Sequence, residues 1–183
     1  MRKFFHRMLA LSAFLLLIAV LSGASIRKMY VQANGEYGWV FHVFSQKLPS
    51  PIKNQQPKSI MYDYTYVEQT DSVAILCTIR LSGAERIGTV GINSCDVASS
   101  TVPEMVYVQP WKNGIEYRLR TYIPFKMWEQ IYDCPAPFTL SFYVASSGDT
   151  SQAYVFSIPD KQWGKNREKI VSIMNIIKLN TGK

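Results

Sequence analysis

Carboxylate side chains are the first candidates for chemistry in this sequence, because two facing carboxylates are the simplest machinery for hydrolysis. The acids that fall on predicted strands or turns are Asp63, Glu68, Asp71, Glu104 and Glu116. Their spacing predicts no pair that converges in one cleft. We expect Asp63, which lies between two tyrosines, to be partly buried and to form a hydrogen bond with the backbone or with Thr65.

Other catalytic and ligand-binding signatures are missing from the sequence. Beyond the first 24 residues the chain has one histidine, His42, which lies in a predicted strand, and no G-x-S-x-G motif accompanies it. There is no glycine-rich phosphate loop, dinucleotide fingerprint or aspartate-rich calcium loop. We therefore expect a protein that is not an enzyme and has no catalytic residue, metal site or cofactor. A hydrolase whose acids meet only in three dimensions is the enzymatic alternative.

The three cysteines show no C-x-x-C spacing, so they do not predict a zinc or dithiol motif. Cys77 lies on the apolar face of a predicted strand and is expected to be a core residue. Cys95 and Cys134 lie in loop-like contexts, and they are the pair we expect if a disulfide forms in an oxidising compartment. The alternative is that the odd thiol pairs with another chain.

The N-terminal segment has the three parts of a secretory signal peptide. The basic start MRKFFHR precedes the apolar run Met8–Leu21, and small residues follow at Ser22 and Ala24. Because the run is shorter than the roughly 20 residues of a membrane-spanning helix, we predict cleavage near Ala24 and export to the periplasm or cell envelope. Loss of the three basic residues of this segment lowers the formal charge from +7 to +4. Such a mild charge does not predict a nucleic-acid partner.

The body of the chain, residues 25–183, alternates apolar and polar residues with the period of β-strands. The strongest region is Ser59–Ser82, which predicts two strands joined by a polar turn at 68–72. Further short strands are predicted at 39–44, 84–92, 104–109, 115–123, 138–145 and 153–158, whereas 25–35, 47–58 and 93–103 are predicted to be irregular. The hairpin-length links predict a single mainly β domain, an antiparallel β-sandwich or bent sheet of about seven or eight strands.

Two segments carry the helical period instead. An apolar stripe after Pro124 predicts a short inserted helix at one end of the sheet, and its members are Phe125, Trp128, Ile131 and Tyr132. Residues 159–180 predict an amphipathic C-terminal helix with Asp160 as its N-cap. This helix either docks on its own sheet with a solvated basic face, or lies on a membrane or in a partner's groove.

The residues that we single out for binding are basic or aromatic. Arg118 and Arg120 lie on the charged face of the predicted strand 115–123, which should meet solvent or a partner. The helix adds basic residues off its apolar stripe, namely Lys161, Lys165 and Lys169. The aromatic candidates are Tyr62, Tyr64, Trp111 and Trp128. The tyrosines predict either a stack inside the sheet or an exposed platform for a ligand.

A resemblance rests on the segment Met61–Ile79, which combines Tyr-Asp-x-Thr-Tyr, a polar turn, Asp-Ser-Val and an alternating strand. Together with the signal peptide and the strand-rich body that ends in a basic helix, it resembles small uncharacterised exported β-sandwich-like proteins of Gram-negative bacteria. The firmest part of the resemblance covers about 20 residues. It implies no assigned activity, so no functional residue is carried over.

We therefore expect an exported, non-catalytic interaction module of the cell envelope, with an envelope protein as its partner. A carbohydrate- or lipid-binding protein that uses exposed aromatics is the alternative. Peripheral contact between the basic helix and a membrane surface is compatible with either function. A concave, aromatic-lined pocket would favour the alternative, two carboxylates facing each other in a cleft would favour a hydrolase, and a flat patch with neither would favour the interaction module.

Overall fold

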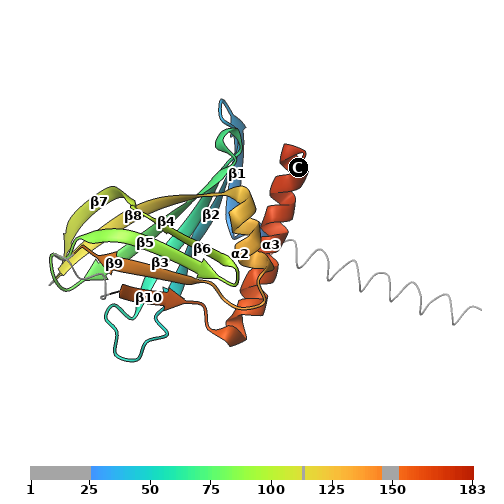
Figure 1. The fold of residues 1–183 in the computed structure, drawn as a ribbon. Coiled ribbons are helices and arrows are strands. Elements are labelled where there is room, and N and C mark those ends of the chain that lie inside the picture. The colour runs from blue at the N-terminus through green and yellow to red at the C-terminus, as the bar shows by residue number, and fades with distance from the viewer. Residues whose placement is uncertain (1–25, 113, 146–152) are drawn as a thin grey trace, which may run out of the picture.

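The computed structural model describes residues 26–112, 114–145 and 153–183 (Figure 1). The predicted signal peptide and its cleavage site near Ala24 lie outside the described residues, as do Asn113 and the predicted turn at 146–152. Among the helices that the structure describes, none combines the length and the apolar character needed to cross a membrane.

The strands of the described residues form two antiparallel sheets, as the sequence predicts (Figure 1). One sheet has six strands in the order β1 (Tyr30–Gly35), β2 (Gly38–Pro49), β3 (Ser59–Val67), β4 (Ser72–Leu81), β8 (Gly114–Pro124) and β7 (Glu104–Trp111). The other has four strands in the order β10 (Ala153–Ser157), β9 (Thr139–Val144), β5 (Ile87–Ser94) and β6 (Val97–Thr101). The mainly β fold is therefore confirmed, with more strands than expected.

The hairpin β3–β4 forms at the predicted place and in a register that keeps the apolar faces together. Tyr62 lies opposite Cys77, and Tyr64 lies opposite Ile75. A single 3-10 turn, Glu68–Thr70, joins the strands, and Asp71 after it has a φ of 45°. A carboxylate oxygen of Glu68 accepts a hydrogen bond from the backbone N–H of Trp39 at 2.8 Å, which fastens this turn to the start of β2.

Three segments that were predicted to be irregular contain strands. The predicted lead-in 25–35 contains β1, and the predicted loop 93–103 contains β6. Both are edge strands without a row of buried apolar side chains, so the sequence signal that marks a strand is weak there. β2 also continues to Pro49, opposite Ser59. A proline is tolerated there because β1 pairs with β2 only from Gly38 to Val43, so the end of β2 lies at the edge of the sheet.

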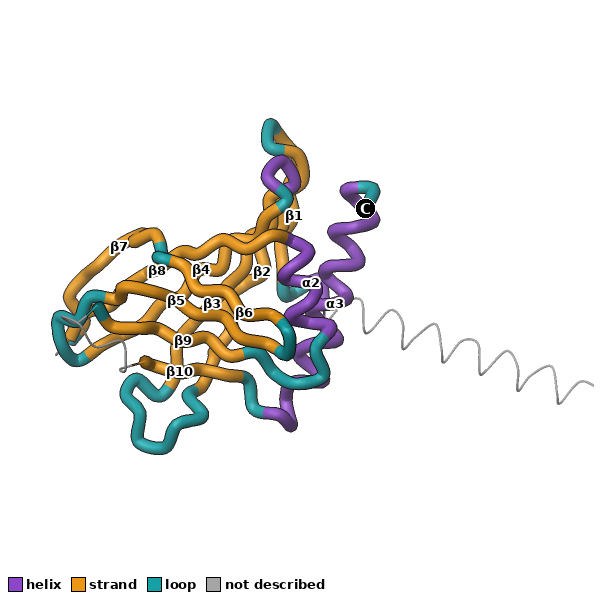
Figure 2. The backbone as a smooth tube through the Cα atoms, in the orientation of Figure 1, coloured by secondary structure: helices purple, strands orange, loops and turns teal. Residues whose placement is uncertain are grey.

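Two helices pack side by side at one end of the sheets (Figures 1 and 2). The helix α2 (Phe125–Asp133) buries the whole stripe that predicted it. The helix α3 (Asp160–Thr181) buries the apolar side chains of Trp163, Ile170, Ile173, Met174 and Ile177. α3 therefore docks on its own domain, and the buried side chains of both sheets and both helices form one core. The predicted N-cap is wrong: Pro159 holds that position, and Asp160 is the first helical residue.

Candidate functional site

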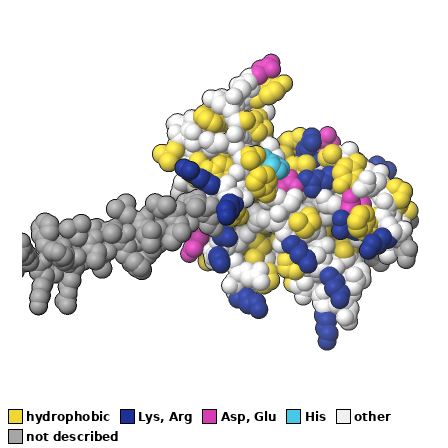
Figure 3. Space-filling model, turned by 180° about the vertical axis from the view of Figure 1, so that it is seen from behind, with side chains coloured by type: hydrophobic (Ala, Val, Ile, Leu, Met, Phe, Trp, Pro, Cys, Tyr) yellow, Lys and Arg dark blue, Asp and Glu magenta, His cyan; other side chains and the backbone are white. Residues whose placement is uncertain are grey.

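The outer face of the six-stranded sheet is the face turned away from the core, and it carries charged side chains from several strands. Residues alternate between the two faces of a strand, and the core takes Tyr62, Cys77 and Leu119. Their neighbours along the strands, among them Asp63, Thr78 and Arg118, therefore point outward. Figure 3 shows basic and acidic side chains interspersed with apolar ones on the molecule seen from behind.

A buried ion pair joins β3 to β8 across β4 on this outer face. Arg118 Nη2 donates to Asp63 Oδ2 at 2.5 Å, and Arg118 Nη1 donates to Thr78 Oγ1 at 2.7 Å. Ser45 Oγ also donates to Asp63 Oδ2, at 3.0 Å, while Asp63 Oδ1 is buried without a hydrogen-bond partner among the described residues. The Asp63 side chain is 1% exposed and that of Arg118 is 18% exposed. Asp63 was expected to bond Thr65 or the backbone, and it instead forms an ion pair with Arg118 that the sequence alone could not show.

A second carboxylate, Glu116 of β8, accepts hydrogen bonds from three donors on the same outer face, nearer to β7. It accepts hydrogen bonds from Arg80 Nε at 2.6 Å, Gln109 Nε2 at 2.8 Å and the Tyr107 hydroxyl at 3.0 Å. Burial opposes the charge of Glu116, but these bonds outweigh burial and hold the pKa of the carboxyl below its ordinary value. The guanidinium of Arg80 also lies over the ring of Trp111, 3.9 Å from its centroid.

These networks are suited to holding charges in place. Asp63 and Glu116 each have an arginine partner, and Arg120 Nη1 donates to Glu104 at 3.3 Å. His42 Nδ1 lies 2.9 Å from Thr65 Oγ1. The part of the chain that the structure describes contains no group of three His, Cys, Asp or Glu side chains arranged to hold a metal ion. The face therefore offers fixed charges, an accessible tryptophan and apolar surface, which are features of recognition.

The strand β7 is the most exposed apolar element beside this face. It is an edge strand that pairs only with β8, and every one of its residues is exposed. Its large apolar side chains are Met105, Val106, Tyr107, Val108 and Trp111. Edge strands are usually protected by charge or short length because unpaired backbone groups recruit other strands. β7 has a bulge at Val106 and a proline at Pro110, but Glu104 is its only charged residue.

The three other sheet edges, β10, β1 and β6, differ from β7, and β6 has only five residues, with the mostly polar sequence VASST. The edge strand β10 is covered by Gln55, whose amide bonds Val155 N–H at 2.9 Å and Val155 C=O at 3.1 Å, as a neighbouring strand would. The edge strand β1 is mostly polar, with the sequence YVQANG. β7 is therefore the edge best suited to pair with an apolar strand from outside.

The lysines predicted to bind a partner lie elsewhere, around the start of α3. Lys161, Lys165 and Lys169 all line one pocket beside β2. The two arginines are less available than the sequence indicated, because Arg118 is committed to Asp63 while Arg120, paired with Glu104, is partly exposed.

Of the two alternatives for the tyrosine row, the structure shows the stack inside the core and not the exposed ligand platform, since the side chains of Tyr62, Tyr64 and Trp128 are buried. The hydroxyls of Tyr64 and Tyr132 lie 2.8 Å apart, and the Tyr64 and Trp128 ring centroids lie 5.0 Å apart. Burial raises the pKa of Tyr64 and of Tyr132 well above the ordinary value. The helices α2 and α3 cover this row of tyrosines, and alternation alone could not say which face would be covered. Of the four aromatic candidates, only Trp111 is exposed.

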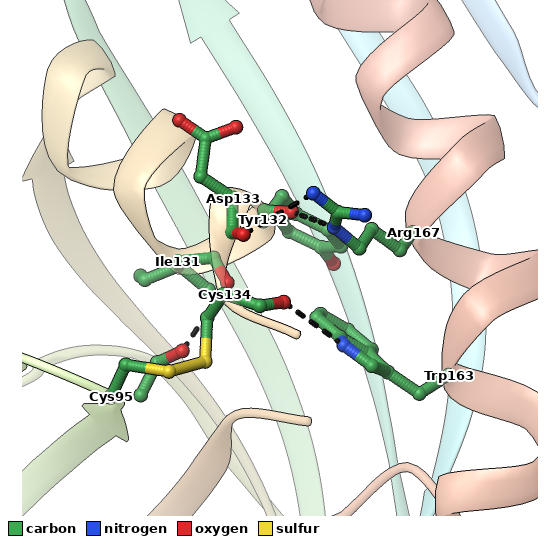
Figure 4. Close-up of a disulfide and its surroundings, with 8 residues drawn as sticks. Cys95, Ile131, Tyr132, Asp133, Cys134, Trp163 and Arg167 are labelled. Carbon is green, nitrogen blue, oxygen red and sulfur yellow. Dashed lines mark hydrogen bonds between the residues drawn. A yellow bond between two sulfur atoms is a disulfide. The ribbon is translucent and has the colours of Figure 1, made fainter. Parts of the chain in front are cut away.

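Cys95 and Cys134, the pair that the sequence favoured, are joined by a disulfide that links the β5–β6 turn to the end of α2 (Figure 4). Around it, Trp163 Nε1 of α3 donates to the carbonyl of Cys134 at 3.2 Å. Arg167 of α3 donates to the carbonyls of Tyr132 at 2.5 Å and Asp133 at 3.2 Å. The last carbonyls of a helix lack partners within it, so these bonds fix the end of α2 against α3.

Comparison of the chain with protein-family models, curated proteins and solved structures finds no match. The resemblance to exported envelope proteins therefore stays a prediction. Sequence reasoning missed the network of Glu116 with Arg80 and the exposure of β7. Opposite charges on two predicted strands were a usable signal, but pairing β4 with β8 required the topology.

Proposed function

We propose that this protein is an exported, non-catalytic interaction module of the cell envelope, which binds an extended strand of a partner protein along the edge of β7. The observation that carries the proposal is an edge strand whose residues are all exposed and largely apolar. Strand addition to such an edge is a common mode of peptide recognition, in which backbone bonds give affinity and side chains give specificity.

The backbone of β7 can make these bonds without losing its own sheet. In an antiparallel pair, hydrogen-bonded and non-bonded residue pairs alternate. Pro110 has no N–H and lies opposite Ile115, which makes that pair non-bonded and gives the same status to Val108 opposite Tyr117. The N–H and C=O of Val108 therefore point away from β8, toward an incoming strand. The Val108 side chain is 50% exposed at the same place.

The residues around Val108 favour pairing with a strand of another protein over pairing with a second copy of this chain. If two β7 strands paired with Val108 opposite Val108, Pro110 of each copy would face the bulged Val106 of the other. Each end of the pairing would then lack a donor, because proline has no N–H and a bulge disrupts the ladder. A partner strand without proline can use all of the outward groups, and it can place an acidic or aromatic side chain next to Arg80 and Trp111.

Site-specific photocrosslinking in intact cells tests the proposal. A photoreactive phenylalanine analogue at Met105, exposed on β7, should form one dominant adduct with an envelope protein, and the same analogue at Leu179 on α3 should not. In the protein that carries the analogue at position 105, Val108→Pro removes the outward N–H and should abolish the adduct. Val108→Thr keeps the N–H and the branched shape, so it should preserve the adduct.

The crosslinked peptide of the partner should come from a segment with a strand-like alternating sequence. An adduct only with a second copy of this chain would refute the foreign-strand partner. An adduct that survives Val108→Pro, or no adduct at Met105, would refute recognition through β7.

A further inference from the structure

A pocket of about 550 Å³ lies where α3 begins, beside β2 and the segment before the helix. Its lysines are Lys47 of β2 and Lys161, Lys165 and Lys169 of α3. The three helical lysines are four residues apart, which places them along one side of α3. Among the residues that the structure describes, no acid lines this pocket, and none of its four lysines takes part in an ion pair.

This concentration of charge has no compensation within the described fold. The three lysines of α3 follow one another at i, i+4 spacing, at which like charges on a helix repel each other. A bound anion would remove the repulsion. By contrast, Lys178 near the end of α3 forms an ion pair with Glu129 of α2.

Two amide side chains of residues that line this pocket leave one donor and one acceptor without a partner. Asn166 Nδ2 donates to Gln46 Oε1 at 2.8 Å, and the Tyr62 hydroxyl donates to the same oxygen at 3.4 Å. Gln46 Nε2 and Asn166 Oδ1 are buried and have no hydrogen-bond partner among the described residues. Buried polar atoms normally have partners, so this pair is prepared for a ligand with both an acceptor and a hydroxyl donor.

We propose that this pocket binds a phosphate-bearing sugar or polyol group, either as a soluble sugar phosphate or as the headgroup of a phosphorylated lipid. The lysines supply charge-assisted bonds to the phosphate oxygens. Gln46 Nε2 donates to a ligand oxygen, and Asn166 Oδ1 accepts from a hydroxyl of the ring. The volume is within the usual range for small-molecule pockets, and Met29, Ile158 and Pro159 offer an apolar wall for the ring.

The proposal is independent of strand binding at β7, because it uses different residues on a different part of the sheet. Calorimetric titration of the purified full chain with glucose phosphate, glucose and inorganic phosphate tests the soluble ligand. Cosedimentation with phosphatidylcholine vesicles, with and without a phosphorylated phosphatidylinositol, tests the lipid headgroup. Binding of glucose phosphate without vesicle binding supports the soluble source, and binding only to the phosphoinositide vesicles supports the headgroup.

Three variants assign the binding to the pocket. Lys165→Ala should weaken binding of the phosphate-bearing probe about tenfold, which equals about 1.4 kcal/mol. Gln46→Glu keeps the oxygen that Asn166 and Tyr62 use but replaces the donor with a negative charge, so it should abolish binding. Lys126→Ala, an equal loss of charge at an exposed position of α2, should leave the affinity unchanged.

Thermal unfolding of each variant shows whether it is folded at the titration temperature. Equal weakening by Lys126→Ala and Lys165→Ala would overturn the site, because it would mean diffuse attraction to a basic surface. Equal affinity for glucose and glucose phosphate would overturn the role of the lysines. Equal affinity for inorganic phosphate and glucose phosphate would overturn the role of Asn166. If neither glucose phosphate nor the phosphoinositide vesicles bind, the proposal itself is overturned.

Discussion

Removing the disulfide between Cys95 and Cys134 tests how the helical end of the molecule is held to the four-stranded sheet. The two cysteines are 39 residues apart in the sequence, so the bridge closes a loop of that size in the unfolded chain. In the chain-entropy model, a loop of this length corresponds to about 4 kcal/mol of stabilisation near room temperature. We expect the double variant Cys95→Ala/Cys134→Ala to lose approximately that free energy of unfolding.

The magnitude is large because an ordinary domain has a total stability of only about 5–15 kcal/mol. The end of α2 also receives hydrogen bonds from Trp163 and Arg167 of α3. These bonds should keep the native arrangement after the bridge is removed, so the double variant should be less stable but correctly folded.

Equilibrium urea unfolding, followed by tryptophan fluorescence under non-reducing conditions, measures this difference. The matched control is Cys77→Ala, which also removes a buried sulfur but no crosslink and should cost only about 1 kcal/mol. If the double variant loses no more than this control, the loop-closure reasoning is refuted. Three free thiols in the native protein, measured before reduction, would refute the bridge.

Two further predictions concern buried ionisable groups of the six-stranded sheet. Arg118→Met should cost about 3 kcal/mol or more, because it leaves the buried carboxylate of Asp63 without its cation. Asp63→Leu/Arg118→Met should recover most of this loss in urea unfolding, and an equally unstable double variant would contradict the ion-pair argument. Burial raises the pKa of Cys77 from an ordinary 9.0 to about 12, so only the unfolded chain releases this proton just above pH 9. The free energy of unfolding should therefore fall as pH rises from 9 toward 12, less steeply in Cys77→Ala, and equal slopes would refute this assignment.

The strand and helix periods predicted much of the fold, and they did so where one face is buried. The β3–β4 hairpin and the stripe of α2 follow directly from such patterns. The strands β1 and β6 lack them because their side chains are mostly exposed or only partly covered. Polar edge strands form through pairing with a neighbour, and this neighbour is a property of the topology rather than of the local sequence.

The candidate sites were harder to predict because they depend on which residues meet across strands. The sequence marked Arg118 as a binding residue, but Asp63, 55 positions away, occupies it. It left the tyrosine row as either a stack inside the sheet or an exposed platform, and only the fold shows that α2 and α3 pack on this face. The lysines of α3 were predicted correctly to lie off the apolar stripe, yet only the fold brings Lys47 and the amides of Gln46 and Asn166 beside them.

The β7 edge and the lysine pocket should act independently. The pocket adjoins β2, and four strand spacings separate β2 from β7 in the six-stranded sheet. At about 4.8 Å per spacing, the separation is about 19 Å, well beyond the roughly 10 Å within which substitutions usually couple. Val108→Pro should therefore abolish the crosslink at Met105 without changing the affinity for glucose phosphate. Lys165→Ala should weaken the binding of glucose phosphate without changing the crosslink.

This independence decides how the two proposed activities combine. If each variant affects only its own readout, one molecule can hold a partner strand and a phosphate-bearing group at the same time. A phosphorylated lipid in the pocket would then tether the partner to a membrane surface. If either variant changes both readouts, the two surfaces share one conformational equilibrium. A separation of about 19 Å across the sheet is then not enough to make them independent.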